Sequence, residues 1–229
     1  MVFKIKQINP VATNIWEEPN RKILSEYKNP NTQIHIATIK AGPIEVTTTY
    51  HDTKAVNYVL EEAEKAEKEG FDAIVMSCFL DVGVDAMREA VDIPVVGACQ
   101  ASVHLASLLG TRISIITDGP KGKRHIEDLV NKYGFAHKLV SIRHVDLAPL
   151  QFAVEKEPLK KQLLKEAKKA IDEDGADVLI LGCGGMNVAP WLQEQTGVPV
   201  IDPLVAALKT IEILATMKLT QSKLAYPKP

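Results

Sequence analysis

Gly70-Phe-Asp-Ala-Ile-Val-Met-Ser-Cys78 and Gly175-Ala-Asp-Val-Leu-Ile-Leu-Gly-Cys183 are two copies of one pattern, and the second copy begins 105 residues after the first. In each copy a glycine precedes an aspartate, a short apolar run and then a cysteine. Further along the chain, Pro94 and Pro199 keep the same offset. The offset of 105 residues is constant from a helix end, through a strand, to the next strand. This constancy predicts a duplicated chain with one thiol in each half.

The composition is that of an ordinary globular protein. Of the 229 residues, 46% are hydrophobic and 24% are charged, which suffices for one large core or two small ones. The 27 basic and 29 acidic side chains leave a formal charge of -2, so we expect no nucleic-acid partner and no membrane partner. The N-terminus lacks the long apolar segment of a signal peptide. We therefore expect a cytoplasmic protein with a small-molecule substrate.

Short apolar runs rich in β-branched residues alternate with helical patterns along the chain. This alternation predicts mostly parallel sheets with helices on both faces. Helical periodicity over residues 56–66 and 159–171 ends at a glycine in each half. The expected strands, four in each half, are residues 3–8, 33–39, 72–77, 94–97, 112–117, 138–145, 177–182 and 198–201. The expected fold class is α/β, with two pseudo-symmetric lobes and the active site in the cleft between them.

Polar and cysteine residues follow corresponding strands in the two halves. Asn9 and Thr117 end the first strand of their half, and Cys78 and Cys183 follow the third. Ligands collect at the carboxyl ends of parallel strands, so these four residues are candidates for one site. A helical pattern follows each cysteine, and we expect the helix dipole to lower the pKa of each thiol so that it can act as a base. Two thiols that face each other across a cleft can remove a proton from one face of a carbon and return it to the other.

The remaining motifs narrow the chemistry. Gly184 and Gly185 directly follow Cys183, and their backbone N–H groups could hold an enolate oxygen, although a tight turn without a ligand explains the pair as well. No dinucleotide or phosphate-binding glycine motif is present, so we expect a reaction without a cofactor. The three cysteines form no metal-ligand spacing with the six histidines, so no metal site is expected. Cys99 is interpreted as a small core residue.

A series of short motifs resembles the aspartate/glutamate/hydantoin racemase superfamily, and most closely its hydantoin racemase branch. The resemblance covers nearly the whole chain, and the order and spacing of the motifs make it specific. The motifs are Ile8-Asn9-Pro10 with Thr13, Gly42-Pro43, Ser77-Cys78-Phe79 with Asp81 and Gly83, Ile93-Pro94-Val95-Val96-Gly97 followed by Ser102-Val-His-Leu-Ala, Ile116-Thr117, Leu181-Gly182-Cys183-Gly184-Gly185-Met186, and Gly197-Val-Pro-Val-Ile-Asp202.

The resemblance implies a racemase in which Cys78 and Cys183 are the acid/base pair, one for each enantiomer. It also implies that a C-terminal helix from about Leu204 packs on the first lobe, so that the lobes are residues 1–98 with 205–229, and residues 99–204. Relatives commonly form oligomers, and we expect a homo-oligomer. The substrate-binding residues implied by the resemblance are Asn9, Val46, Phe79, Thr117, Gly184 and Gly185.

Departures from the family's pattern bear on the substrate. The amino-acid racemases of the family carry small polar residues after their cysteines, whereas Phe79 and Leu80 follow Cys78. A less charged, cyclic substrate fits this change, and a 5-substituted hydantoin is the expected one. The alternatives are allantoin, aspartate or glutamate, and maleate in a cis-trans isomerisation. A decarboxylase of the superfamily would need only the second cysteine. From another class, a non-catalytic two-lobed ligand-binding protein would have the same architecture.

Overall fold

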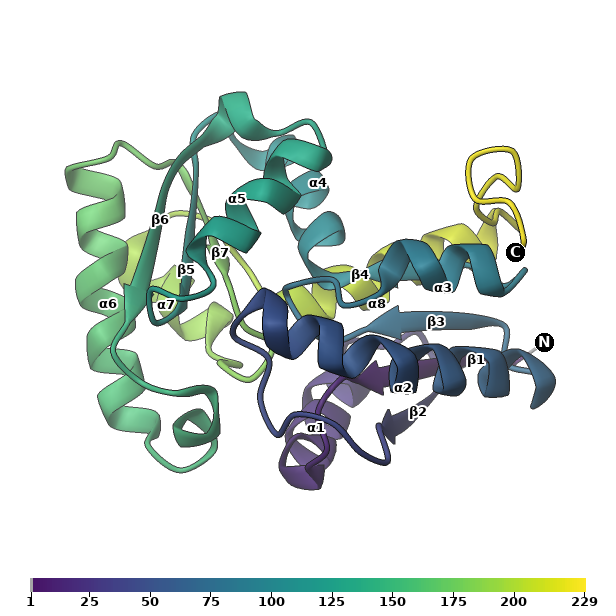
Figure 1. Ribbon diagram of the computed structural model, residues 1–229. Coiled ribbons are helices and arrows are strands. Elements are labelled where there is room, and N and C mark those ends of the chain that lie inside the picture. The colour runs from purple at the N-terminus through teal and green to yellow at the C-terminus, as the bar shows by residue number, and fades with distance from the viewer. Residues whose placement is uncertain (1) are drawn as a thin grey trace.

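Two four-stranded sheets form the two halves of the protein in the computed structural model, which describes residues 2–229. The strand order is β2-β1-β3-β4 in the first sheet and β6-β5-β7-β8 in the second, with every neighbouring pair parallel (Figure 1). The strands are β1 (Phe3–Asn9), β2 (Thr32–Thr38), β3 (Ala73–Met76), β4 (Val95–Gly97), β5 (Ile113–Asp118), β6 (Leu139–Val145), β7 (Val178–Leu181) and β8 (Val200–Ile201). The predicted fold class and all eight predicted strands are confirmed, with ends that differ by one or two residues.

The inner strands are apolar throughout, so polar and reactive side chains can occur only where these strands end. β3 and β7 consist only of apolar residues, and every residue of both strands is buried. A parallel strand covered by helices on both faces requires such a continuous apolar run. The chain therefore leaves this apolar run only where the strands stop, at Ser77 and Cys78 after β3 and at Gly182 and Cys183 after β7.

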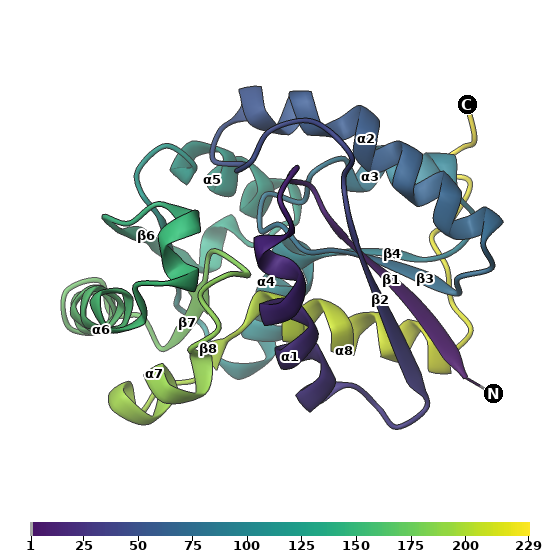
Figure 2. The ribbon, with the colours of Figure 1, turned by 90° about the horizontal axis from the view of Figure 1, so that it is seen from below.

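Helices cover both faces of each sheet. On the first sheet, α2 and α3 lie on one face and α1 and α8 on the other; on the second, α6 and α7 lie opposite α4 and α5 (Figure 2). The helices are α1 (Glu17–Tyr27), α2 (Thr49–Lys68), α3 (Val84–Ala90), α4 (Ala98–Leu109), α5 (Lys123–Lys132), α6 (Lys156–Asp172), α7 (Ala189–Thr196) and α8 (Pro203–Thr216), with 3-10 turns η1 (Asn14–Trp16), η2 (Ala136–Lys138) and η3 (Pro149–Ala153).

The last helix of each half packs on the other half. α4 follows β4 of the first sheet but packs on β7, β8 and α5 of the second, whereas α8 follows β8 of the second sheet but packs on β3, β4 and α1 of the first. α4 and α8 also pack against each other, and both bury alanines such as Ala101 and Ala207, whose small side chains allow a close approach. This exchange fixes the two halves relative to each other, and therefore fixes the cleft between them.

Glycine ends the helix before the third strand in both halves, as predicted. Gly70 after α2 and Gly175 after α6 have φ angles of +75° and +70°. This left-handed backbone conformation has little steric cost only for glycine, because it lacks a Cβ atom. The chain can thus reverse within a few residues and enter the strands that the two cysteines follow.

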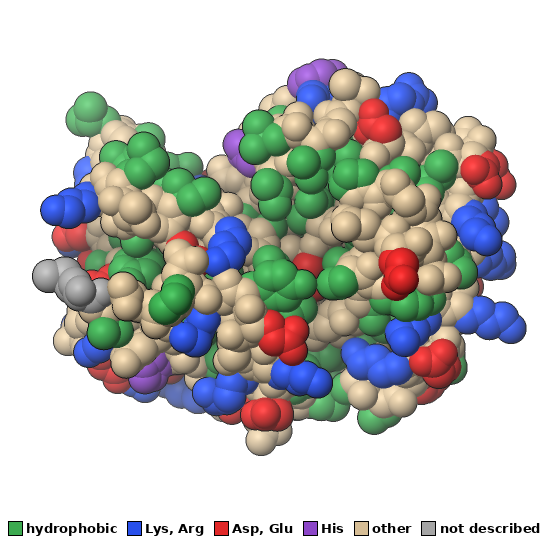
Figure 3. Space-filling view, turned by 180° about the vertical axis from the view of Figure 1, so that it is seen from behind, with side chains coloured by type: hydrophobic (Ala, Val, Ile, Leu, Met, Phe, Trp, Pro, Cys, Tyr) green, Lys and Arg blue, Asp and Glu red, His purple; other side chains and the backbone are tan. Residues whose placement is uncertain are grey.

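Charged side chains of both signs are mixed over the face of the molecule that Figure 3 shows. The 29 acidic and 27 basic side chains nearly cancel, which leaves a formal charge of -2. Across residues 2–229, no helix combines the length and the apolarity needed to cross a membrane.

Candidate active site

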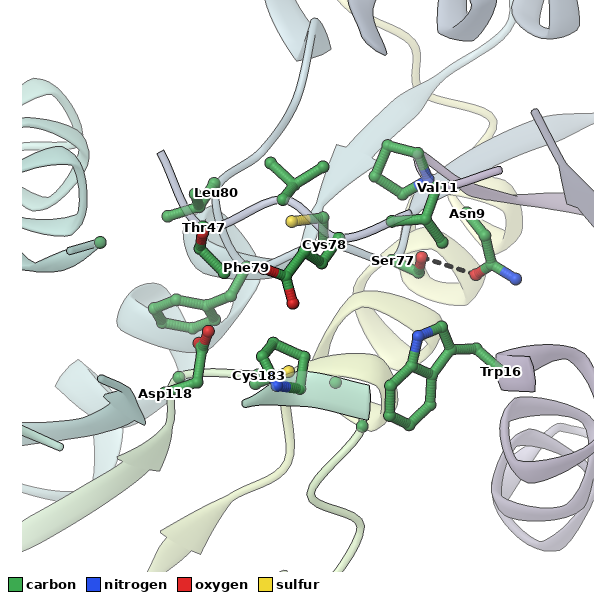
Figure 4. A pocket seen from close by; sticks show the side chains of 18 of the residues that line it. Asn9, Val11, Trp16, Thr47, Ser77, Cys78, Phe79, Leu80, Asp118 and Cys183 are labelled. Carbon is green, nitrogen blue, oxygen red and sulfur yellow. Dashed lines mark hydrogen bonds between the residues drawn. The ribbon is translucent and has the colours of Figure 1, made fainter. Parts of the chain in front are cut away.

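Loops from both halves enclose one cavity at the carboxyl ends of β1, β3, β5 and β7. Cys78 lines it from the first half and Cys183 from the second, and Figure 4 shows the two side chains on opposite sides of a gap. The six predicted pocket residues, Asn9, Val46, Phe79, Thr117, Gly184 and Gly185, all line this cavity. Cys99 does not line it, since its side chain is fully buried in α4.

The two cysteines lie in the same kind of turn. The N–H of Asp81 donates to the carbonyl oxygen of Cys78 (3.0 Å), and the N–H of Met186 donates to that of Cys183 (3.3 Å). Asp81 and Asn187 then adopt left-handed φ angles of +48° and +49°. Aspartate and asparagine tolerate this conformation better than other residues that carry a side chain. The hydrogen-bonded turn is therefore repeated in the same register, whereas the left-handed residue comes three positions after Cys78 and four positions after Cys183.

The glycines beside Cys183 make room for groups that are remote in sequence. A Cβ atom on Gly184 would lie 3.0 Å from the carbonyl oxygen of Ser77, so the two cysteine turns are in direct contact. A Cβ atom on Gly185 would lie 2.6 Å from Cζ3 of Trp16, which also lines the cavity. Trp16 is not among the predicted pocket residues. Its position in the cavity depends on residue 185 being a glycine, which the sequence around Trp16 does not reveal.

Asn9 is fixed by a buried polar network. Its Oδ1 accepts hydrogen bonds from Nε2 of Gln7 (2.7 Å), Nδ2 of Asn20 (3.1 Å) and Oγ of Ser77 (2.8 Å). Its Nδ2 has no partner among the described residues, although Asn9 is only 1% exposed. A buried donor without an acceptor costs free energy. Asn9 thus brings a hydrogen-bond donor without a protein acceptor to the wall of the cavity.

Asp81 ties the Cys78 turn to the second half. Its carboxylate accepts from the N–H groups of Cys99 and Gln100 at the start of α4, both at 2.9 Å, and from the hydroxyl of Tyr133 at 2.7 Å. Burial raises the pKa of Asp81 to about 6, while these donors act in the opposite direction. The turn that carries Cys78 is thus held by α4 and by the end of α5.

Burial dominates the protonation of both thiols. It raises the pKa of Cys78 to about 12 and that of Cys183 well above its usual range, against the opposing effect of the N–H groups of Leu80 and Gly185. The prediction that helix dipoles lower these pKa values was wrong. The reason is distance along the chain, because α3 and α7 begin six residues after the respective cysteines.

The titratable side chains that line the cavity, apart from the thiols, are acidic. Within residues 2–229 these are Glu45 and Asp118, and no lysine, arginine or histidine lines it. Desolvation, together with the charge of Glu45, raises the pKa of Asp118 to about 7. The same part of the chain contains no group of three or more His, Cys, Asp or Glu side chains that could hold a metal ion. A bound anion would thus find no basic side chain in the cavity wall.

Two duplicated α/β lobes, with a cavity between the carboxyl ends of their parallel strands, define the class of two-lobed racemase-type enzymes. The chain belongs to the Asp/Glu/hydantoin racemase family, whose model matches residues 5–211, and it is accordingly an isomerase. The hydantoin racemase of Pseudomonas sp. (strain NS671) is 38% identical over 230 residues, which cover 99% of this chain and 92% of that protein. The resemblance identified in the sequence is thereby confirmed.

Solved structures of allantoin racemases share the fold closely. The enzyme from Klebsiella pneumoniae is 31% identical and superposes with a TM-score of 0.94, covering 99% of this chain and 94% of its own. The enzyme from Pseudomonas fluorescens is 28% identical with a TM-score of 0.95, covering 99% and 97%. The chain is therefore a racemase of the hydantoin and allantoin racemase group.

Proposed function

We propose that this racemase interconverts the enantiomers of a 5-substituted hydantoin without a cofactor, by proton transfer between Cys78, the C5 carbon and Cys183. The proposal is carried by one observation, that a thiol from each half lines the same cavity from opposite sides. C5 of a hydantoin lies next to a carbonyl group, so loss of its proton gives an enolate. A base on one face of the ring and an acid on the other then invert the stereocentre.

In each direction one cysteine acts as a thiolate base and the other as a thiol acid. The thiolate removes the C5 proton, and the opposite thiol donates its own proton to the other face; the reverse reaction exchanges the roles. Burial makes the thiolate rare, but the same raised pKa makes it a stronger base toward a weakly acidic carbon. One negative charge passes from sulfur to the enolate and on to the second sulfur, so the cavity carries the same net charge throughout.

Donors near the two sulfur atoms would hold the oxygen atoms of the ring. The unpartnered Nδ2 of Asn9 is one such donor, and the backbone N–H of Gly184, which lines the cavity beside Cys183, would be another. Donors directed at the developing enolate oxygen are worth about 3–4 kcal/mol each in other enzymes. Phe79 and Val46 would form an apolar wall beside the ring.

The charge of the cavity favours a neutral ring over an amino acid. The α-carboxylate of aspartate or glutamate would face Glu45 and Asp118 without a basic partner, and maleate carries two such groups. The named relatives are a hydantoin racemase and allantoin racemases. Allantoin is itself a hydantoin with a substituent at C5, so it lies within the proposed substrate class.

Polarimetry on a panel of enantiopure substrates tests the proposal. The panel contains several 5-substituted hydantoins, allantoin, aspartate and glutamate, with maleate followed by NMR. We expect enzyme-dependent loss of rotation with hydantoins and none with the amino acids. Racemisation of aspartate or glutamate alone would contradict the proposed substrate. Tight binding of a hydantoin without any loss of rotation would contradict catalysis and support a ligand-binding protein.

A further inference from the structure

Asp118 is a cavity residue that the proposed proton transfer does not use. It follows Thr117 at the end of β5 and lines the cavity, where Figure 4 shows its carboxyl group pointing toward the ring of Phe79, beside the gap between Cys78 and Cys183. The hydroxyl of Thr117 donates to its Oδ1 at 3.1 Å, and its own backbone N–H is a second donor. No basic side chain lines the cavity within residues 2–229, so the carboxyl group has no counter-ion there.

A carboxylate at this position opposes the proposed chemistry. Negative charge on Asp118 raises the pKa of both Cys78 and Cys183, so it disfavours the thiolate that must remove the proton. It would also repel the negative charge that develops on the ring. The carboxyl group of Glu45 also lines the cavity, and its negative charge raises the pKa of Asp118. An uncharged side chain would serve proton transfer better, so the carboxyl group requires another role.

The C5 substituent is the part of a hydantoin with which such a group can make a contact that keeps its strength through the reaction. The ring N–H groups can also donate to a carboxylate, but removal of the C5 proton places negative charge on the ring, so a carboxylate in contact with the ring is increasingly repelled as the reaction proceeds. The substituent gains no charge. A donor on the substituent would meet the carboxyl group equally in the ground state and in the transition state, and would orient C5 between the two sulfur atoms.

We propose that Asp118 selects the C5 substituent, and that this protein, if it is the hydantoin racemase proposed above, prefers hydantoins whose substituent carries N–H donors, charged or neutral. The carboxyl group accepts up to two N–H···O bonds from an amino, guanidino or ureido group. An apolar substituent offers the half-buried carboxyl group no donor beyond the Thr117 hydroxyl, and an anionic substituent is repelled by both Asp118 and Glu45.

Enantiopure hydantoins with substituents of similar size test this preference. We choose butyl as the neutral reference, 3-aminopropyl as the cation, ureido (allantoin) as the neutral donor and carboxymethyl as the anion. At pH 8 the expected kcat/KM for the 3-aminopropyl and ureido compounds exceeds that for butyl by roughly 10-fold or more, since hydrogen bonds to a charged group are the strong ones. The carboxymethyl compound is expected to be the slowest of the four.

Substitution of Asp118 separates charge from hydrogen bonding. Asp118→Asn is expected to lower the 3-aminopropyl to butyl ratio of kcat/KM by roughly 10- to 100-fold, because it removes the charge. Asp118→Ala also removes the acceptor and should lower the ureido to butyl ratio. Asp128→Asn makes the same charge change on α5, where the Asp128 side chain is 68% exposed, and should leave both ratios unchanged.

The pH dependence of the ratio is a second measurement. Since the pKa of Asp118 is about 7, the 3-aminopropyl to butyl ratio should rise between pH 6 and pH 8 in the unmodified protein and stay flat in Asp118→Asn. Titration of the thiols affects both substrates and cancels in the ratio.

The outcomes distinguish the role of Asp118 from the proposed function. Equal loss of activity toward all substituents in Asp118→Asn would place the carboxyl group at the ring and overturn the inference, as would unchanged ratios. Racemisation of butylhydantoin also reports that the variant is folded. If the unmodified protein racemises none of the hydantoins, the proposed function itself fails; racemisation of all four without preference overturns only the selection by Asp118.

Discussion

Tyr133, at the end of α5 in the second half, donates a 2.7 Å hydrogen bond to Oδ2 of Asp81 in the turn that carries Cys78 in the first half. The same carboxylate accepts from backbone N–H groups at the start of α4. The position of Cys78 therefore depends on how the two halves pack, and the bond between Tyr133 and Asp81 is a direct probe of that packing.

Removal of this hydroxyl group should destabilise the protein in a pH-dependent way. Tyr133→Phe is expected to lower the free energy of unfolding by about 1.5–3 kcal/mol at pH 8, because a buried carboxylate loses a donor. The pKa of Asp81 is about 6, so near pH 5 the group is protonated and the loss should be smaller. Urea unfolding at the two pH values measures the difference, with Tyr50→Phe, at a residue 67% exposed, as the control. A loss of equal size at both pH values would exclude a role for the charge.

Single replacements of Cys78 and Cys183 should strongly reduce racemisation but preserve proton exchange on one face of C5. Cys78→Ser and Cys183→Ser are each expected to reduce racemisation by roughly 10²- to 10⁴-fold, since each removes one proton-transfer group. The remaining thiol can still remove and return a proton on its own face. In deuterated water the two variants should therefore exchange the C5 hydrogen of opposite enantiomers, which NMR measures after subtraction of the uncatalysed rate.

Cys99→Ala is the matched control for the thiol replacements. Cys99 is fully buried in α4 and does not line the cavity, so its replacement should leave racemisation and exchange of both enantiomers intact. If Cys78→Ser and Cys183→Ser exchanged the same enantiomer, or if either racemised at the unmodified rate, the assignment of one thiol to each face would be wrong.

Position 185 tests how closely Trp16 must approach the Cys183 turn. Gly185→Ala places a Cβ atom 2.6 Å from the Trp16 ring, and the resulting shift is expected to cost about 1–3 kcal/mol of stability and to raise KM. Trp16→Phe in the same chain should recover part of the loss, and a double-mutant cycle gives the coupling. Gly122→Ala, also in the cavity wall, is the control for stability, since its Cβ atom would lie 3.7 Å from the nearest atom at an ordinary φ of -81°. Additive effects of Gly185→Ala and Trp16→Phe would show that the contact does not limit the site.

The sequence predicted the strands and the paired cysteines because both are local signals. A continuous apolar run such as Ala73–Met76 is buried in any parallel sheet, and the repeated spacing marks Cys78 and Cys183 as equivalent. Trp16 was missed because its place in the cavity depends on a contact with the distant Gly185, whereas Asp118 directly follows Thr117 and the strand-end rule that identified Thr117 could have found it. A helical pattern likewise does not say which sheet the helix covers, so the packing of α4 on the second half could not be deduced from periodicity.

The wrong prediction of the thiol pKa values has a physical reason as well. A helix dipole acts only over the first turn, whereas burial acts wherever water is excluded. The pattern after each cysteine predicted a helix, but not that six residues would separate the thiol from its first turn. It also did not predict that Cys78 and Cys183 would be desolvated in a cavity between the halves. For a residue in a cleft between duplicated halves, the desolvation depends on packing that sequence periodicity does not describe.

Asp202 combines a helix cap with a costly buried charge. Its Oδ1 accepts from the N–H groups of Leu204 (2.9 Å) and Val205 (3.2 Å) at the start of α8, whereas Oδ2 is buried without a partner among residues 2–229. Burial raises its pKa from 3.8 to about 6. Between these values the folded protein holds a proton that the unfolded chain has lost, so the contribution of Asp202 to stability falls as the pH rises from about 4 to about 6 and stays low above that.

Two replacements of Asp202 separate the cap from the charge. Asp202→Asn keeps an oxygen for the cap and removes the charge, so the thermal midpoint should rise at pH 8 and change little at pH 4.5, where the native carboxyl group is already protonated. Asp202→Ala also removes the cap, and the difference between the two uncharged variants should be about 1 kcal/mol. Loss of the cap should fray the start of α8, where Leu204 packs against Gly184; its Cδ2 atom lies 3.0 Å from the position of a Cβ atom on Gly184. Asp202→Ala, but not Asp202→Asn, should therefore also slow racemisation. Calorimetry and polarimetry at both pH values measure these effects, and a lower midpoint for Asp202→Asn at pH 8 would mean that the charged carboxylate stabilises the fold despite its burial.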